Sequence, residues 1–219
     1  MLSRHFTDIA ALRLAMVGLV LAVAGCASTG SAPGGADGSR GGQPAAAGAR
    51  QGEVPPEALT MYEQAVAAMA SGDFLDAELR FKEFLLQYPG YPGAHVNLAI
   101  IHVNNDNDED AVAAVDAALA IDPEYAPALN QLGMLHRRNG NFLEAEAAYM
   151  KAVTVSPDYA LAHYNLGVLN ELYLQRLDSA LQHFERYQQI VGGDEQVEKW
   201  ITDLQRRVAA SQRTANISE

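Results

Sequence analysis

The chain has 219 residues, of which 49% are hydrophobic and 19% are charged, an ordinary balance for a globular protein. Its formal net charge of -12 argues against nucleic-acid binding and against a polybasic grip on anionic lipid, because both need a basic surface. The sequence contains a single cysteine, so packing and not an internal disulfide must hold the fold together.

The N-terminal segment has the layout of a signal peptide. Arg4 and Arg13 give it a positively charged start, and residues 14–22 form an apolar run. This run is too short to span a bilayer as a helix, which takes about 20 apolar residues. The only cysteine, Cys26, follows directly behind two small residues. We therefore expect the N-terminus to be a targeting segment.

Residues 23–26, VAGC, resemble the lipobox of bacterial lipoproteins. The resemblance implies that Cys26 is lipidated through its nucleophilic thiol, that the chain is cleaved before it, and that the new N-terminus is acylated. Several acyl chains make a stable anchor where one is marginal. Because Ala27 is not the aspartate that retains such proteins in the inner membrane, the resemblance implies an outer-membrane anchor that faces the periplasm. The alternatives are an ordinary secretory signal with a chance cysteine, or a buried core thiol.

The segment at 27–54 is dominated by Gly, Ala, Ser and Pro and shows no apolar periodicity. Such a composition cannot bury enough apolar surface to offset the entropy of ordering, which predicts a flexible linker. As a glycine-rich coil it would have a root-mean-square span of roughly 30 Å. Its glycines do not indicate a phosphate-binding loop, because no strand precedes them and no helix opens after them.

A repeated pattern begins near residue 56. The tripeptide Pro-x-Tyr occurs three times, and its prolines, Pro89, Pro123 and Pro157, are 34 residues apart. A 34-residue period in a helical pattern resembles the tetratricopeptide repeat. The resemblance covers about residues 58–192 and implies an all-α fold in which helix-turn-helix units stack into a superhelix.

Small residues recur where the paired helices of such repeats pack closely, and a larger apolar residue follows on the same helix face. The small residue of the first helix is Ala65, Ala99, Gly133 or Gly167. That of the second helix is Ala77, Ala111, Ala145 or Ala180, and the larger residue four positions later is Phe81, Val115, Tyr149 or Phe184.

Turn signals separate the two helices of a repeat. Gly72-Asp73 and Gly140-Asn141 each predict a glycine that ends one helix and an Asp or Asn that caps the next. The fourth repeat departs from this pattern, because Ala180 comes one residue late and the turn before it contains no glycine.

Beyond the fourth repeat the pattern stops. Gly192 and Gly193 replace the expected proline, and Asp194 is suited to cap one more helix, which has an apolar stripe. We expect this amphipathic helix to cover the end of the array. The predicted segments are a signal peptide at 1–25, a lipidated N-terminus and flexible linker at 26–55, repeats at 56–192 (58–91, 92–125, 126–159 and 160–192), a capping helix at 193–209 and a disordered tail at 210–219.

Two groups of residues suggest metal sites at first sight. Four histidines lie at repeat positions four and eleven, which normally hold packing residues, and no cysteine or carboxylate completes a ligand set around them. The acidic run at 104–110 lacks the glycine and glutamate of a calcium loop. We expect no metal, no cofactor and no catalysis, since no nucleophile has a recognisable partner. The histidines are His95, His102, His136 and His163.

The resemblance also implies a concave groove, lined by the first helix of each repeat. Carried over to this sequence, its positions predict a mainly apolar lining with two adjacent arginines. We expect it to hold an extended or helical peptide that has apolar anchors and a carboxylate or polar group at the arginines. The alternative for the arginines is a solvated helix end. The predicted groove residues are Tyr62, Val66, Val96, Ile100, Asn104, Asn130, Met134, Arg137, Arg138, Tyr164, Val168 and Glu171.

These features predict a membrane-anchored scaffold or adaptor that binds protein partners while cell-envelope complexes assemble. The resemblance suggests roles such as secretin or pilus piloting, and outer-membrane or wall biogenesis. Two alternatives are an accessory subunit of a proton-driven, energy-transducing envelope complex and an activator of a cell-wall enzyme. The expected partners are a protein or peptide segment and, through Cys26, the lipid bilayer, with no nucleic acid. The sequence leaves the oligomeric state open.

Overall fold

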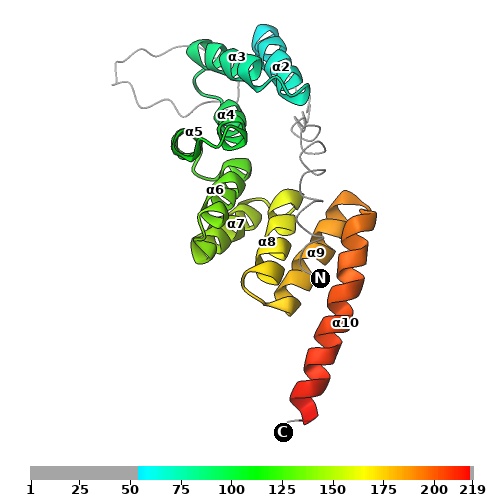
Figure 1. Ribbon diagram of the computed structural model, residues 1–219. Helices are drawn as coiled ribbons and strands as arrows, with labels where there is room; N and C mark the ends of the chain where they lie inside the picture. The colour runs from blue at the N-terminus through cyan, green and yellow to red at the C-terminus, as the bar shows by residue number, and fades with distance from the viewer. Residues whose placement is uncertain (1–53, 218–219) are drawn as a thin grey trace, which may run out of the picture. The chain divides into compact units, whose positions relative to one another are not determined.

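The computed structural model describes residues 54–217, and all regular structure in that range is α-helical (Figure 1). Cys26, the signal segment and most of the linker lie outside the described residues. No helix within 54–217 is both long and apolar enough to cross a bilayer. The all-α fold expected from the sequence is confirmed.

The helices follow one another with short connections, as helix-turn-helix repeats require. The chain divides into two compact units, Met1–Arg80 and Phe81–Glu219. The first unit contains α2 and the start of α3, and the second contains the rest. The helices are α2 (Pro56–Ala70), α3 (Phe74–Gln87), α4 (Pro92–Asn104), α5 (Asp108–Ile121), α6 (Ala126–Arg138), α7 (Phe142–Val155), α8 (Ala160–Leu172), α9 (Leu177–Val191) and α10 (Glu195–Ile217).

The repeated tyrosine marks the start of each first helix in the second unit. Tyr91, Tyr125 and Tyr159 are the N-cap residues of α4, α6 and α8, and none of them caps through its side chain. Their rings fill space between repeats instead. Burial raises the pKa of the Tyr125 and Tyr159 hydroxyls, which is the sign of a phenol held away from water.

A left-handed residue connects the two helices of every repeat. The residues are Gly72 (φ 83°), Asp106 (φ 55°), Gly140 (φ 78°) and Gln175 (φ 56°). The last of these is 35 residues after its predecessor, where the others are 34 apart, so the late Ala180 reflects one extra residue before this turn. Asp73 caps α3 as expected, because its carboxylate accepts a hydrogen bond from the Asp76 amide at 3.1 Å. The expected Asn141 side-chain cap is absent from α7.

Glycine and an aromatic ring meet where the helices of the third and fourth repeats pack. A Cβ on Gly133 would lie 2.5 Å from the Tyr149 ring, and one on Gly167 would lie 2.6 Å from the Phe184 ring. Both rings are buried. The small and large residues identified in the sequence are therefore in direct contact, and each ring occupies the space that a glycine leaves empty.

In the second unit three hairpins pack in sequence: α4 with α5, α6 with α7, and α8 with α9 (Figure 1). Each second helix also contacts the next first helix, and the first helices contact one another, α4 with α6 and α6 with α8. These contacts bring the exposed sides of α4, α6 and α8 together on one surface, which we call the first-helix face. Asn97, Gln131 and Asn165, at equivalent positions of the three first helices, are buried.

The last helix closes the second unit. Gly192 ends α9 in a left-handed conformation (φ 78°), and the Asp194 carboxylate accepts hydrogen bonds from the amides of Gln196 and Val197 at 2.9 and 3.1 Å. Helix α10 packs against α9. We expected it to end near residue 209, but it continues to Ile217. The expected tail contains neither Gly nor Pro over residues 210–217, so nothing in its sequence stops the helix.

Candidate functional site

The predicted groove residues do not all lie in one unit. Tyr62 and Val66 are half-buried on α2, in the first unit. The others lie on α4, α6 and α8 in the second unit. The structure sorts these into core residues, residues covered by the last helix, and residues that remain on the first-helix face.

Two of the predicted lining residues belong to the core. Val96 is 7% exposed and packs with Ala118 and Ala128, while Asn130 is 4% exposed. The Asn130 side-chain oxygen accepts a hydrogen bond from the Asn165 amide at 2.9 Å, which ties α6 to α8. Both side chains are therefore unavailable to a ligand, because they point between helices.

The predicted residues of the fourth repeat are covered from the C-terminal side. The Tyr164 ring lies 5.3 Å from Tyr187 and 6.0 Å from Trp200, measured between ring centroids, and Val168 packs against the same core cluster. The Glu171 carboxylate is 2.6 Å from the Arg207 guanidinium. Helix α10 therefore covers part of the predicted lining of this repeat, and Tyr164, Val168 and Glu171 remain half-buried.

Arg138 is committed to the preceding repeat. Its guanidinium is 2.7 Å from the carboxylate of Asp106, in the turn before α5, and 2.9 Å from that of Asp108, the first residue of α5. These acids belong to the run that looked at first like a calcium loop. The charge of Arg138 is therefore matched by two carboxylates of the same chain.

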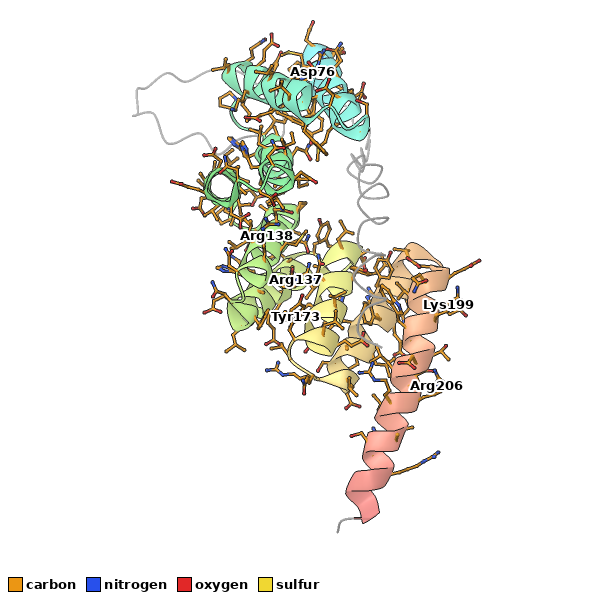
Figure 2. The ribbon with its side chains drawn as sticks, viewed as in Figure 1. Asp76, Arg137, Arg138, Tyr173, Lys199 and Arg206 are labelled. Atoms are coloured by element: carbon orange, nitrogen blue, oxygen red, sulfur yellow. The ribbon has the colours of Figure 1, made fainter. Side chains whose placement is uncertain are left out.

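Arg137 has no such partner. It is half-buried, and it forms no ion pair with any residue of the described chain. It lies near the Tyr149 and Tyr164 hydroxyls. Burial raises the pKa of each tyrosine to about 12, and the positive charge of Arg137 opposes that rise. Figure 2 labels the two neighbouring arginines.

Three further predicted residues remain on the first-helix face. Ile100 and Met134 are half-buried and each packs at the edge of a core cluster. Asn104 is exposed, and its amide donates to the Ile100 carbonyl at 2.9 Å. With Arg137 they form a face that is apolar in α4 and the middle of α6 and positively charged at the end of α6.

Sequence reasoning identified Tyr149 only as a packing residue and gave no role to Phe142 or Tyr173. The Tyr149 hydroxyl is buried and has no hydrogen-bond partner of good geometry. Tyr173, at the end of α8, acts electrostatically on Tyr149, and its ring lies 4.6 Å from the Phe142 ring. The signal in the sequence was the turn of the fourth repeat, which has Tyr173 and Leu174 before Gln175, where the third repeat has only Asn139 before Gly140.

The histidines act mainly as packing residues. His102 and His163 are buried, and His95 and His136 are half-buried. The His163 Nε2 lies 3.1 Å from the Pro157 carbonyl, and its Nδ1 lies 3.2 Å from Nδ1 of His183. Within the described residues no three His, Cys, Asp or Glu side chains are grouped as metal ligands.

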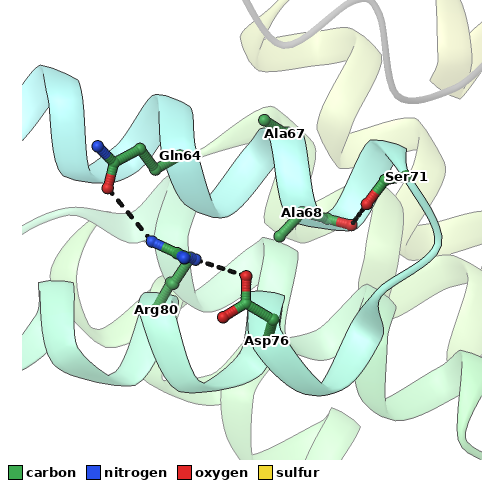
Figure 3. A pocket seen from close by; sticks show the side chains of 6 residues that line it. All are labelled: Gln64, Ala67, Ala68, Ser71, Asp76 and Arg80. Atoms are coloured by element: carbon green, nitrogen blue, oxygen red, sulfur yellow. Dashed lines mark hydrogen bonds and ion pairs between the residues drawn. The ribbon is translucent and has the colours of Figure 1, made fainter.

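A hollow lies in the first unit, between α2 and the start of α3 (Figure 3). Its one cation is Arg80, whose guanidinium is 2.6 Å from the Asp76 carboxylate and 3.2 Å from the Gln64 amide oxygen. The hollow is open and its charges are paired, so it offers no group with unmet bonding needs.

A family model described as the tetratricopeptide repeat matches residues 55–126 and 130–195. The chain belongs to the tetratricopeptide repeat family. This fold is typical of protein–protein interaction scaffolds, and proteins of this family are generally not catalysts. No curated protein matches the sequence significantly.

Several solved structures share the tetratricopeptide fold at low sequence identity. That of Pseudomonas aeruginosa pilF has a TM-score of 0.62 at 21% identity, covering 70% of this chain and 69% of that one. A thermophilic tetratricopeptide repeat protein in Thermus thermophilus has a TM-score of 0.60 at 22% identity, covering 68% and 82%. The MamA protein has a TM-score of 0.55 at 19% identity, covering 73% and 86%. These likenesses concern the fold.

Proposed function

We propose that this protein is a lipid-anchored adaptor of the bacterial outer membrane, which binds a segment of a partner protein on its first-helix face while envelope complexes assemble. The observation that carries the proposal is Arg137, a half-buried cation without an acidic partner on a partly apolar face. The chain has a net charge of -12 and many acidic residues, yet none of them pairs with Arg137. This cation is therefore available to bind an acidic group of a ligand.

The anchor rests on Cys26 and the residues around it. The apolar run, the small residues before the cysteine and the absence of any other cysteine support lipidation. The linker would let the helical part reach partners near the membrane surface. Catalysis has no place in this proposal, since the residues of the first-helix face include no nucleophile paired with a base.

Photo-crosslinking in cells tests the binding face. A benzophenone amino acid replaces Ile100 or Met134 on the first-helix face, and, as matched controls, Val112 or Met150, which are exposed on second helices. We expect one envelope protein to be captured from the first two positions and not from the last two. Mass spectrometry of the product identifies the pathway. Equal capture from all four positions would contradict a specific face.

Metabolic labelling with palmitate tests the anchor separately. The wild-type chain should be labelled and should fractionate with the outer membrane, whereas Cys26→Ala should be unlabelled and lose that location. A wild-type chain as unlabelled as Cys26→Ala would rule out lipidation. It would leave the first-helix face unaffected, because the two tests address different parts of the chain.

A further inference from the structure

Two histidines meet between the helices of the fourth repeat. Nδ1 of His163, on α8, lies 3.2 Å from Nδ1 of His183, on α9. Nε2 of His163 donates to the Pro157 carbonyl at 3.1 Å, because a carbonyl oxygen can only accept. This hydrogen bond fixes the tautomer of His163 and leaves the lone pair of its Nδ1 directed at the second ring. The pairing is not visible in the sequence, because 20 residues separate the two histidines.

The packing of the repeats does not require a histidine at position 183. His183 stands three residues after Ala180, the small residue of α9. The equivalent residues of α5 and α7 are Ala114 and Ala148, and both are buried. An alanine therefore satisfies the packing at this place in two other repeats. The imidazole of His183 is an addition in the fourth repeat, and it lies within reach of a second imidazole.

The two nitrogens have the separation that a shared metal ion requires. Zinc binds imidazole nitrogens at about 2.0–2.1 Å, so two of them in a tetrahedral arrangement lie about 3.3 Å apart. A turn of each ring aims both lone pairs at one ion, and His183 is half-buried, which leaves the pair open to solvent on its side. The hydrogen bond to Pro157 is also the kind of contact that orients metal-binding histidines.

The carboxylates that act on the pair are already matched by arginines. Glu146 acts on one ring, and its carboxylate is 2.6 Å from the Arg176 guanidinium. Asp158 acts on the other ring, and its carboxylate is 2.5 Å from the Arg186 guanidinium. These four charges balance, so the surroundings do not repel a cation. Because no group of three His, Cys, Asp or Glu ligands occurs in the described residues, water completes the coordination of an ion.

We propose that His163 and His183 form a binding site for a divalent ion of a late first-row transition metal, held by both Nδ1 atoms and by water. Imidazole suits Zn²⁺ and Cu²⁺, of which Cu²⁺ binds more tightly. On binding, the proton of His183 moves from Nδ1 to Nε2, so both rings stay neutral and no proton is released. The ion then joins α8 to α9 in place of one hydrogen bond. The inference does not depend on the first-helix face.

Calorimetric titration of the full-length chain with Zn²⁺ tests the site, and Mg²⁺ is the matched control ion. Mg²⁺ prefers oxygen ligands, so it reports binding to the acidic surface alone. We expect one Zn²⁺ to bind in an event that Mg²⁺ does not produce, and the ring signals of His163 and His183 to shift in NMR spectra. No such Zn²⁺ binding, or Zn²⁺ binding that leaves both ring signals in place, would overturn the site.

Variants drawn from the neighbouring repeat assign the binding to the two histidines. His183→Ala and His163→Leu introduce the residues that the third repeat has at these places, Ala148 and Leu129, so the fold should tolerate both. Each should weaken Zn²⁺ binding about tenfold or more, since the loss of even an outer contact of a metal site has an effect of that size. Zn²⁺ bound by both variants as tightly as by the wild type would overturn the assignment.

His95→Gln is the control for these variants. His95 has the place of His163 in the second repeat, but Ala114 stands where α9 has His183. His95→Gln should therefore bind Zn²⁺ as the wild type does. A loss of binding in His95→Gln as large as that in His183→Ala would mean that the ion is not held by the pair, and the site would be rejected.

Discussion

At the scale of single residues, the close approach of α6 and α7 depends on one missing methyl group. Replacing Gly133 by alanine places a Cβ 2.5 Å from the buried Tyr149 ring, and that ring has no free space to enter. We expect Gly133→Ala to lower the free energy of unfolding by about 1–3 kcal/mol, the usual cost of overpacking, even though alanine favours helix. Urea unfolding measures this.

The matched control for that change is Gly90→Ala. Gly90 has open space around its Cβ position and no left-handed backbone. Its substitution should change stability by less than about 0.5 kcal/mol. A Gly133→Ala protein as stable as Gly90→Ala would show that the helices separate without cost, and the small-residue rule would not explain this pair.

The turn of the fourth repeat offers the opposite kind of change. Gln175 holds a φ of 56°, a conformation that side chains with a Cβ adopt at a cost and glycine adopts freely. Its equivalents in the first and third repeats are glycines. We expect Gln175→Gly to raise the free energy of unfolding by up to about 1 kcal/mol, and Gln175→Ala, the control, to give no gain. A melting temperature lowered by the glycine would contradict the strain argument.

At the scale of elements, two histidines link α8, α9 and the turn before α8. The Pro157 carbonyl can only accept, so His163 donates from Nε2 and its Nδ1 accepts from Nδ1–H of His183. This arrangement needs a neutral His163, because its Nδ1 must keep a lone pair to accept the hydrogen bond. Burial lowers the pKa of His183 to about 4 and that of His163 in the same direction. Arg186 and Asp158 act on His163, and Glu146 acts on His183.

A pKa that is lower in the folded state makes stability depend on pH. Well above pH 6.5 both rings are neutral in the folded and in the unfolded chain, and their contribution to stability is fully present. As the pH falls toward 4 the unfolded chain takes up protons first, so the free energy of unfolding decreases. For partly exposed groups we expect a loss of about 1–2 kcal/mol between pH 7.5 and 5. Urea unfolding of wild type and His183→Gln at both values tests it, and identical pH profiles would contradict the role of the pair.

The elements themselves were largely predictable from the sequence, because each depends on local signals. The Pro-x-Tyr period located the first helices, and the late Ala180 matched the extra residue before Gln175. The predicted end of α10 was wrong, because the composition of residues 210–219 suggested a frayed tail whereas the helix continues to Ile217. The candidate site was predicted only in part. Repeat positions identified Arg137, but not that Arg138 is paired with two acids or that Tyr164 is covered by α10, because both depend on contacts between repeats.

At the scale of the whole molecule, a repeat protein has mainly nearest-neighbour contacts, so damage at one end should stay near that end. Trp200 of α10 packs its ring on Tyr164 and Phe184, at centroid distances of 6.0 and 5.7 Å. Trp200→Ala removes this contact from the fourth repeat and touches no residue of α4 or α5. Hydrogen exchange should therefore show α8 and α9 amides exchanging about tenfold or more faster, with α4 and α5 amides changing far less.

Arg213→Ala, an exposed change on the same helix, serves as the control and should alter neither. Uniform acceleration from α4 to α10 would mean that the second unit unfolds as one cooperative body. In that case the loss of a single interface at the end would weaken the first-helix face along its whole length.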